Sequence, residues 1–410
     1  MEGVDFMKEK LRVSALVLLI LCFVSFLAYG VHFNCFGTST ETMMQFFRID
    51  ESRQGMILTV QSIGGIVMTV LLGLYGERIN KIHGIALGLG LMGVASVLIG
   101  AIPAWCEIGS GYGLMLVFSL LAGLGSLTVD LLMNGVITDV FPERKNVFLP
   151  YVHAFYGVGA MLAPMYVSAL AAPDAPETFA RPYLILGILA VVLCGVLMLN
   201  ALRVNPHTPY RDMATLRKRA CGNPAEVFRD LRAWLYLAAC FLYLVFQTGL
   251  SAWLPQYSMN VLKYPYASAA KMATFYFLGA LLMRLLSPAI YKRMSVRKFY
   301  VVTISVSTVL FALFLFLPWG PVMTRVLIFV LGLLQGAAIP SMVILCSDSF
   351  PGRSASASSI IVLSVSLAAL AGPSLMGTVI QNSGYLWAMI MILVCLPMSI
   401  LPLMLATREK

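Results

Sequence analysis

The chain repeats one pattern from end to end: long runs of apolar residues separated by short polar stretches. A helix that crosses a bilayer needs about 20 consecutive apolar residues, and only helices and closed barrels satisfy the polar backbone groups within lipid. The runs are too long and too continuous for the strands of a barrel. We therefore predict an all-α membrane protein whose twelve spans occupy 12–34, 54–76, 83–103, 112–138, 147–171, 182–202, 233–257, 269–291, 298–317, 322–345, 355–380 and 385–405.

One polar segment is much longer than the other breaks in this pattern. Residues 203–232 are rich in arginine and follow the sixth apolar run. We predict that they link an N-terminal six-helix half, 1–202, to a C-terminal six-helix half, 233–410. The first apolar run is too long for a cleaved signal peptide, and no small-residue cleavage site accompanies it.

Charge is scarce and unevenly placed. Only 11% of the residues are charged, against about 25% in soluble domains, and the net charge is +10. With the N-terminus in the cytoplasm, the inner segments hold 21 of the 28 Lys and Arg, the outer loops hold six, and Arg284 lies within a span. Cytoplasmic loops carry such an excess. The charge therefore predicts topology, with both termini cytoplasmic, and it gives no reason to expect a nucleic-acid partner.

Several kinds of chemistry have no signature in this sequence. The eight cysteines show no CxxC pair or metal-ligand spacing, and no Walker A or HExxH motif occurs. We predict no metal, no cofactor and no enzymatic activity. Cys35 and Cys106 fall near the outer ends of their predicted helices, so both a disulfide and free thiols remain open. The sequence has no Asn-x-Ser/Thr sequon, which favours a bacterial inner membrane.

The two halves resemble each other in sequence. Residues 123–164 align without gaps on 332–373, with nine identities that include Gly123 on Gly332. "DVFPER" (Asp139 to Arg144) falls on "DSFPGR" (Asp348 to Arg353). A second match places 59–78 on 274–293. Such self-similarity is typical of transporters built from two repeats.

Polar residues within the spans are where the halves differ. Asp130 and Asn134 lie one turn apart on one helix face, and their counterparts in the second half are apolar. Asp130, His153 and Arg284 fall at similar depths, Asp130 about 13 Å from its helix end at 1.5 Å per residue. An ionisable group there costs about 2.5–3.5 kcal/mol on insertion scales, which makes function the default hypothesis. Structural hydrogen bonds or a packing ion pair are the alternatives.

These features resemble a known family. Twelve helices in two similar halves, with "GLYGERINK" (Gly73 to Lys81) after the second span, are similar to the major facilitator superfamily. Glu77 stands where that motif usually has Asp, and Asn80 where it has Gly. The resemblance implies alternating access between two six-helix halves, with Glu77, Arg78, Asp139, Arg144, Asp348 and Arg353 as gating candidates. Solvated loop turns are the alternative reading of these charges.

A narrower resemblance is to the fucose–galactose–glucose/proton symporters. It rests on "DLLMN" followed by "VFPER", and on "HAFYGVGAMLAP", "FLYLVFQTGLSAWLPQY" and "FYFLGALLMR". It implies proton coupling, for which Asp130 and His153 are the candidates. Gly37 stands where that family often has an acid, which argues for another ion or for uncoupled transport.

Amides and aromatic rings within spans fit recognition of a neutral polar solute, because rings bind flat apolar faces and amides both donate and accept. Packing and membrane-interface anchoring are the alternatives for each residue. The substrate-binding candidates are Asn134, Arg284, Gln247, Trp253, Asn34, Gln61, Tyr276 and Gln335.

Together these observations predict a secondary active transporter that moves a small polar solute, most simply a sugar, across the cell membrane with protons or another coupling ion. The expected partners are that solute, the ion and the lipid bilayer, and we expect a monomer. A proton-coupled drug exporter is an alternative, although Ala163-Pro164 replaces the Gly-Pro typical of exporters. A facilitative transporter is another.

Overall fold

The computed structural model describes residues 2–172, 174–204, 225–264 and 272–408. Within these ranges every named element is a helix. They are α1 (Glu2–Thr38), α2 (Thr40–Phe47), α3 (Glu51–Tyr75), η1 (Gly76–Arg78), α4 (Lys81–Trp105), α5 (Tyr112–Val140), η2 (Pro142–Arg144), α6 (Lys145–Leu170), η3 (Pro176–Phe179), α7 (Ala180–Val204), α9 (Ala225–Arg229), α10 (Leu231–Asn260), α12 (Met272–Tyr291), α13 (Val296–Phe316), α14 (Pro321–Gln335), α15 (Ala338–Ser349), α16 (Ser354–Ser383) and α17 (Tyr385–Ala406).

Among the described residues, twelve stretches are long and apolar enough to cross a membrane, which confirms the predicted all-α fold and the number of spans. The tenth span, Pro321–Ser349, is not one continuous helix. α14 ends at Gln335, and a turn at Gly336 and Ala337 precedes α15. Pro340 explains this break, because proline has no N–H to donate to the carbonyl four residues earlier, which is that of Gly336.

The helices form two compact units that do not follow the two halves of the sequence. The first unit comprises Met1–Pro142, Phe155–Pro224 and Gly352–Ser356. The second comprises Glu143–Ala154, Ala225–Pro351 and Ala357–Lys410. α6 and α16 therefore each contribute to both units. Most of the predicted linker, 205–224, lies outside the described residues.

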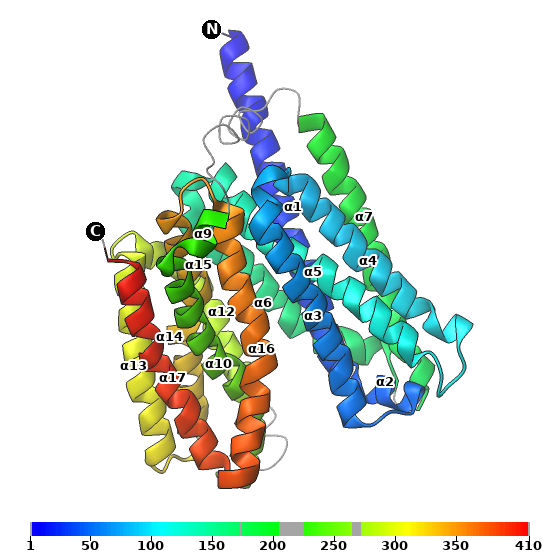
Figure 1. Cartoon of the computed structure of the whole chain (residues 1–410), viewed down its shortest axis with the longest axis vertical. Coiled ribbons are helices and arrows are strands. Elements are labelled where there is room, and N and C mark those ends of the chain that lie inside the picture. The colour runs from blue at the N-terminus through cyan, green and yellow to red at the C-terminus, as the bar shows by residue number, and fades with distance from the viewer. Residues whose placement is uncertain (1, 173, 205–224, 265–271, 409–410) are drawn as a thin grey trace. The chain divides into compact units, whose positions relative to one another are not determined.

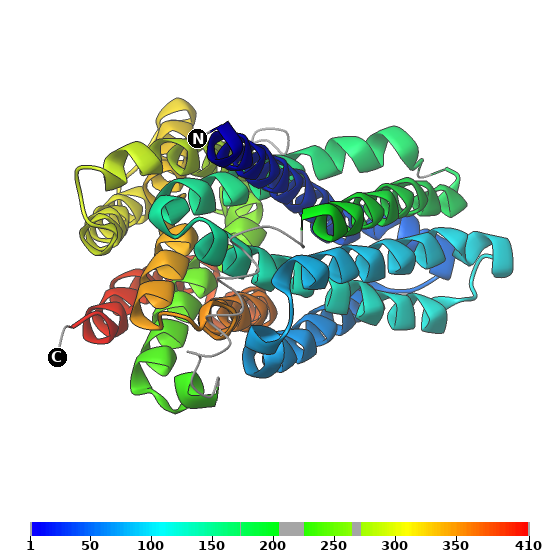
Figure 2. The ribbon, with the colours of Figure 1, turned by 90° about the horizontal axis from the view of Figure 1, so that it is seen from above.

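In the first unit, α5 packs between α3 and α4, and α4 packs on α7. α4 and α7 lie side by side in both views (Figures 1 and 2). Glycines allow α3 and α5 to meet at backbone distance. A Cβ on Gly123 would lie 1.9 Å from the carbonyl oxygen of Gln61, and one on Gly64 would lie 2.3 Å from that of Leu120. Small residues permit such close approach of membrane helices.

In the second unit, α10 packs on α17, and α12 packs on α14 (Figure 1). The α12–α14 contact repeats the α3–α5 contact position by position. A Cβ on Gly332 would lie 1.9 Å from the carbonyl oxygen of Tyr276, and one on Gly279 would lie 2.1 Å from that of Phe329. Gly64 aligns with Gly279 and Gly123 with Gly332. The internal repeat thus corresponds to one helix crossing that is built twice.

The two cysteines near the predicted outer ends of their helices do not form a disulfide. Cys35 and Cys106 are both free thiols. Cys35 is fully buried in the apolar core of the first unit, and Cys106 packs at the edge of that core. Both cysteines therefore act there as small apolar side chains.

Candidate functional site

Asp130 lies deep within the first unit. It is ten residues from the end of α5 at Val140, a depth of about 15 Å, and its side chain is 7% exposed. The hydroxyl of Tyr29 on α1 lies 3.4 Å from Oδ2, and the amide nitrogen of Asn134 lies 3.3 Å from Oδ1. No salt bridge to Asp130 occurs among the described residues. Its hydrogen-bond partners are neutral donors.

Aromatic rings cluster around Tyr29, whose hydroxyl lies at this carboxyl group. The rings of Tyr29 and Tyr156 are 5.0 Å apart, and that of Phe26 lies 5.4 Å from Tyr29. Asn34, one of the predicted solute ligands, donates to the carbonyl of Gly30 at 2.9 Å and lies 3.5 Å from the Tyr156 hydroxyl. This group of side chains combines aromatic rings with hydroxyl and amide groups. Tyr29 and Tyr156 were not predicted as site residues: Tyr29 belongs to no quoted motif, and Tyr156 lies within "HAFYGVGAMLAP" but was not singled out there.

Arg284 occupies the break in the tenth span. From α12, its Nε donates to the carbonyl of Gly336 at 3.0 Å, and its Nη1 donates to the carbonyl of His153 on α6 at 2.9 Å. Pro340 leaves the Gly336 carbonyl without its helical donor, and the guanidinium replaces that donor. The guanidinium is therefore fixed by backbone oxygens of two other spans. His153 contributes its backbone here, while its side chain is buried.

Gln335, at the end of α14, lies beside two tyrosines. The Tyr276 hydroxyl donates to its Oε1 at 2.8 Å, and the Tyr243 hydroxyl donates to its backbone carbonyl at 3.1 Å. Its amide nitrogen is buried and has no hydrogen-bond partner among the described residues. Two N–H donors are thus available beside tyrosine rings. Leaving a buried donor unmatched costs about 1–3 kcal/mol, so a ligand that accepts these bonds gains this energy.

The remaining predicted solute ligands differ in surroundings. Gln61 is buried on α3, and its amide nitrogen also lacks a partner within the described structure. Gln247 and Trp253 on α10 are half-buried. Trp253 packs against α16, where a Cβ on Gly377 would lie 3.1 Å from its ring. Gln61 aligns with Tyr276 in the repeat, so equivalent positions carry an amide in one unit and a phenol in the other.

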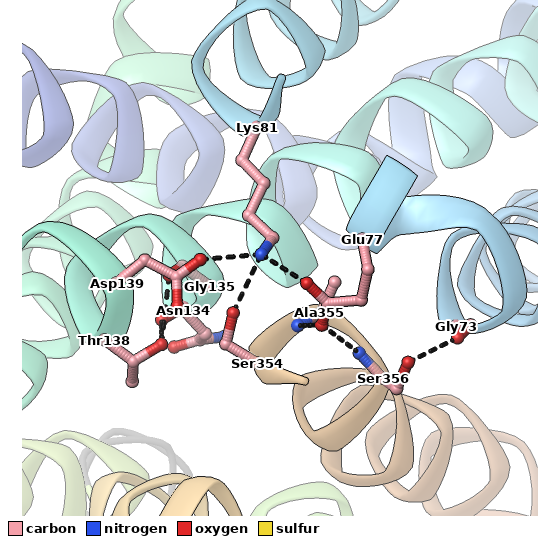
Figure 3. A network of polar contacts seen from close by, with 10 residues as sticks. All are labelled: Gly73, Glu77, Lys81, Asn134, Gly135, Thr138, Asp139, Ser354, Ala355 and Ser356. Atoms are coloured by element: carbon pink, nitrogen blue, oxygen red, sulfur yellow. Dashed lines mark hydrogen bonds and ion pairs between the residues drawn. The ribbon is translucent and has the colours of Figure 1, made fainter. Parts of the chain in front are cut away.

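A second polar group lies at the C-terminal end of α5, where Glu77, Lys81, Asp139 and Ser354 meet (Figure 3). We call these four residues the Lys81 cluster. Lys81 Nζ lies 2.7 Å from Glu77 Oε2, 2.6 Å from Asp139 Oδ2 and 2.9 Å from the Ser354 hydroxyl. The side chains of Glu77, Lys81 and Asp139 are 5%, 8% and 16% exposed. Both ion pairs are therefore largely shielded from solvent.

Glu77 also caps α16. Its Oε1 accepts hydrogen bonds from the backbone N–H groups of Ala355 at 2.6 Å and Ser356 at 3.3 Å (Figure 3). The first N–H groups of a helix have no partner within that helix, and a carboxylate there is favoured by the helix dipole. The Ser356 hydroxyl donates to the carbonyl of Gly73 at 2.8 Å. Three contacts therefore tie the start of α16 to the end of α3.

The cation at this end differs from the predicted ones. Glu77 and Asp139 do meet, but through Lys81. Arg78 is exposed and lies over the ring of Tyr75, with 5.6 Å between its Cζ and the ring centre. Arg144 is exposed as well. Lys81 was the base that closes "GLYGERINK", and its i,i+4 spacing from Glu77 was the available signal.

The matching acid of the second half, Asp348, also pairs with a lysine, but in a more exposed place. Asp348 forms an ion pair with Lys145 at the start of α6. Arg353, which was predicted to act with Asp348 in gating, is half-buried and lies in the segment Gly352–Ser356 of the first unit. Asp348 is 56% exposed. Both halves of the repeat therefore carry the acid, but its exposure and the helix that supplies its lysine differ.

Twelve spans, a duplicated helix crossing and an ionisable group deep in each unit define a polytopic transporter assembled from two repeats. Comparison of the sequence with family models matches the Major Facilitator Superfamily over residues 19–373 and 273–410. The chain belongs to this superfamily. It is a transporter and a multi-pass membrane protein.

Individual relatives are distant in sequence. The chain is 25% identical over 260 residues to human "Protein spinster homolog 1", covering 60% of this chain and 46% of that protein. It thus spans about half the length of that relative. It is 23% identical over 331 residues to the "Uncharacterized MFS-type transporter YfkL" of Bacillus subtilis, covering 80% and 81%.

Solved structures share the fold. FucP in its outward conformation matches with a TM-score of 0.79 and 16% identity, covering 97% of this chain and 100% of that one. The proton:xylose symporter XylE bound to 6-bromo-6-deoxy-D-glucose matches with a TM-score of 0.76 and 12% identity, covering 95% of both chains. These similarities confirm the predicted resemblance to sugar–proton symporters at the level of the fold.

Proposed function

We propose that the chain is a secondary active transporter that couples a small polar solute to the proton gradient through Asp130. The observation that carries this proposal is the environment of the carboxyl group. Asp130 is buried deep in α5, and its hydrogen bonds come from the neutral groups of Tyr29 and Asn134. A carboxyl group without a permanent counter-ion can exist charged or neutral, and protonation exchanges one state for the other. His153, a second titratable group in a span, is the candidate for a further step in the proton path.

The solute that these surroundings favour is a neutral molecule with several hydroxyl groups, such as a monosaccharide. The buried amide of Gln335 offers two N–H donors beside Tyr276, and Gln61 offers two more. Tyr29 and Tyr156 supply ring faces. Hydroxyl groups accept from amides and donate to carbonyl oxygens, whereas the apolar face of a sugar ring packs on aromatic rings. Asn34, Asn134, Gln247, Trp253 and Arg284 complete the proposed set.

The Lys81 cluster is the proposed gate. Its ion pairs join Glu77, Lys81 and Asp139, and the start of α16 is held by the hydrogen bond from Lys81 to Ser354 and by the two capping hydrogen bonds to Glu77. In the topology with both termini cytoplasmic, this cluster lies on the cytoplasmic side of a bacterial inner membrane. Breaking it releases α16 from α3, as alternating access requires of one end of the molecule. The Lys145–Asp348 pair is the corresponding contact of the second unit.

The proposal is tested by transport into proteoliposomes of purified protein, with a panel of radiolabelled monosaccharides and, separately, cationic dyes. A sugar that accumulates against its own gradient when a pH gradient is imposed identifies the substrate. Asp130→Asn should abolish this accumulation but retain counterflow exchange, which needs no net proton movement. Asp174→Asn, an exposed acid outside the spans, is the matched control and should behave like the parent.

Other outcomes decide between the alternatives. Equal sugar uptake with and without the pH gradient would indicate a facilitative transporter. Movement of dyes rather than sugars would indicate an exporter. Accumulation by Asp130→Asn to the level of the parent would show that Asp130 is not the coupling site.

A further inference from the structure

A second contact between α1 and α5 lies one helical turn from the one that holds Asp130. The imidazole Nδ1 of His32 lies 3.2 Å from the hydroxyl oxygen of Ser126, and both side chains are fully buried. His32 follows Tyr29 by three residues on α1, and Ser126 precedes Asp130 by four on α5, so each pair shares a helix face. The Tyr29–Asp130 and His32–Ser126 contacts are therefore neighbouring side-chain contacts between the same two helices, one turn apart.

The number of protons on the Ser126 hydroxyl determines which atom donates in the His32–Ser126 hydrogen bond. A serine hydroxyl has one proton to donate, and Ser126 donates it to the carbonyl of Ala122 at 2.7 Å. Toward His32 the oxygen must then accept, so His32 carries its proton on Nδ1. In a neutral imidazole the other nitrogen is then a bare acceptor. Nε2 is indeed buried and has no hydrogen-bond partner among the described residues. Ser126 is thus the one hydrogen bond that orients the ring there.

We propose that His32 is a positioning residue for the coupling carboxyl group. Its Nδ1–H bond to Ser126 sets how α1 lies along α5, and this register places the Tyr29 hydroxyl at Asp130. The Tyr29–Asp130 separation of 3.4 Å is at the outer limit of a hydrogen bond. A small slide of α1 would break it, so the contact depends on its neighbour. This inference rests on the proposed function, because it concerns the group through which coupling is proposed to occur.

Among the ionisable groups that face this part of α1, Asp130 is the carboxyl group near His32. Within the described part of the first unit, α5 contributes Asp130, α6 contributes Tyr156, and α7 contributes Tyr183, whose ring lies 5.2 Å from that of Phe36. α1 itself contributes Tyr29 and Cys35, and the described side chains of α2 contribute no ionisable group. Because Nε2 is buried without a partner among the described residues, we take His32 to be a neutral ring, and the titration that it influences is that of Asp130.

The test compares how solute accumulation depends on pH in variants that each change one hydrogen-bonding group. Tyr29→Phe removes the hydroxyl at Asp130. Ser126→Ala removes the acceptor for His32 with little change in volume. His32→Asn keeps an amide N–H close to the position of Nδ1, whereas His32→Leu has no donor. His83→Asn, at the start of α4, is the control histidine.

We expect Tyr29→Phe, Ser126→Ala and His32→Leu to move the pH of half-maximal accumulation in the same direction. The size expected for one lost ordinary hydrogen bond is about 0.4 to 1 on the pH scale. His32→Asn should restore most of the parent profile, and His83→Asn should match it. On a Tyr29→Phe background, His32→Leu should add nothing, because residues that act through one contact are not additive.

A second measurement does not depend on transport. Infrared difference spectra on changing pH show the carbonyl stretch of a protonated carboxyl group, which Asp130→Asn assigns to Asp130. Its midpoint should move in Ser126→Ala as the transport profile does. If Tyr29→Phe moves the midpoint but Ser126→Ala and His32→Leu do not, the positioning role is wrong while the proposed function stands. If Asp130→Asn leaves the transport profile unchanged, the proposed function itself has failed.

Discussion

At the scale of single residues, the polar groups within the spans are held mainly by neutral side chains and by backbone oxygens. Asp130 is held by Tyr29 and Asn134, and Arg284 by the carbonyls of Gly336 and His153. Hydrogen bonds of this kind fix the direction in which each group points. A transporter that must change the charge or the ligand of its site during each cycle has use for groups of this kind.

Arg284→Lys and Arg284→Ala test the importance of the guanidinium fork. Lysine keeps the charge, but its single ammonium group cannot reproduce two directed N–H bonds from a planar group. Both variants should reduce uptake, and Arg284→Ala should also lower the free energy of unfolding by about 1–3 kcal/mol for each carbonyl left without a partner. Uptake and detergent denaturation measure the two effects. Arg181→Lys, at an exposed position, is the control, and parental uptake in both Arg284 variants would exclude the role.

Lys81→Met should be far more damaging than Lys145→Met. Removing Lys81 leaves Glu77 and Asp139 buried as neighbouring carboxylates, and losing one partner of a buried ion pair costs about 3–5 kcal/mol. Removing Lys145 leaves an exposed Asp348, where an ion pair is worth about 0–1 kcal/mol. Denaturation of the two purified variants measures the difference. Lys81→Met/Asp139→Asn should recover part of the loss, and equal stability of the two single variants would contradict the burial argument.

The sequence was informative about residues where local spacing decides the contact. Asp130 and Asn134 are four apart on one helix and do touch, as that spacing predicts. The partners of Arg284 were beyond prediction, because they are backbone oxygens that no side-chain pattern marks. Pro340 was the visible signal, since it frees one of those oxygens. His32 was missed because a lone histidine in an apolar run carries no pattern, and only its neighbours give it a role.

At the scale of helices, the two units repeat the same crossing. Gly123 and Gly332 each bring a helix within backbone contact of its neighbour, at aligned positions. The predicted spans were close to the observed ones because bilayer thickness fixes their length. The break in the tenth span was not predicted. Neither Gly336 nor Pro340 is unusual alone within a membrane helix, and the counterparts in α5 are leucines.

Gly123→Ala tests whether this crossing is as tight as its geometry indicates. The added methyl group would lie 1.9 Å from a backbone oxygen of α3, so the helices must separate. We expect a loss of about 1–3 kcal/mol in stability, as for other overpacked sites, and a similar loss for Gly332→Ala. Gly195→Ala on α7, where nothing lies within 4 Å of the added atom, should change stability by less than about 0.5 kcal/mol. Similar melting of all three variants would show that the crossing relaxes freely.

At the scale of the whole molecule, the chain combines a duplicated scaffold with polar groups that are not duplicated. Asp130 and Arg284 face Ile339 and Thr69 in the alignment, and each lies in a different unit. The superfamily and the number of spans were predictable from hydropathy, the repeat and the segment "GLYGERINK". The exchange of short segments between units was not, because it depends on contacts between residues more than 200 positions apart.

Topology is tested with a thiol that the chain already carries. Cys221 lies in the segment 203–232, which the distribution of Lys and Arg places in the cytoplasm. With the other cysteines replaced, a membrane-impermeant maleimide should label Cys221 in inside-out vesicles and not in intact cells. Ser110→Cys, in an exposed loop on the predicted outer side, should show the reverse. Labelling of Cys221 in intact cells would overturn the orientation.

The cap on α16 has a consequence for biosynthesis. Glu77 accepts its hydrogen bond from Ala355, which follows it by 278 residues. At about 5–20 residues per second, the ribosome needs about 14 to 56 s to add that stretch. During this time Lys81, which follows Glu77 by four residues, is already present as a partner for the acid. The first unit is thus completed only when most of the chain has been translated, and the last bonds to form are those at the proposed gate.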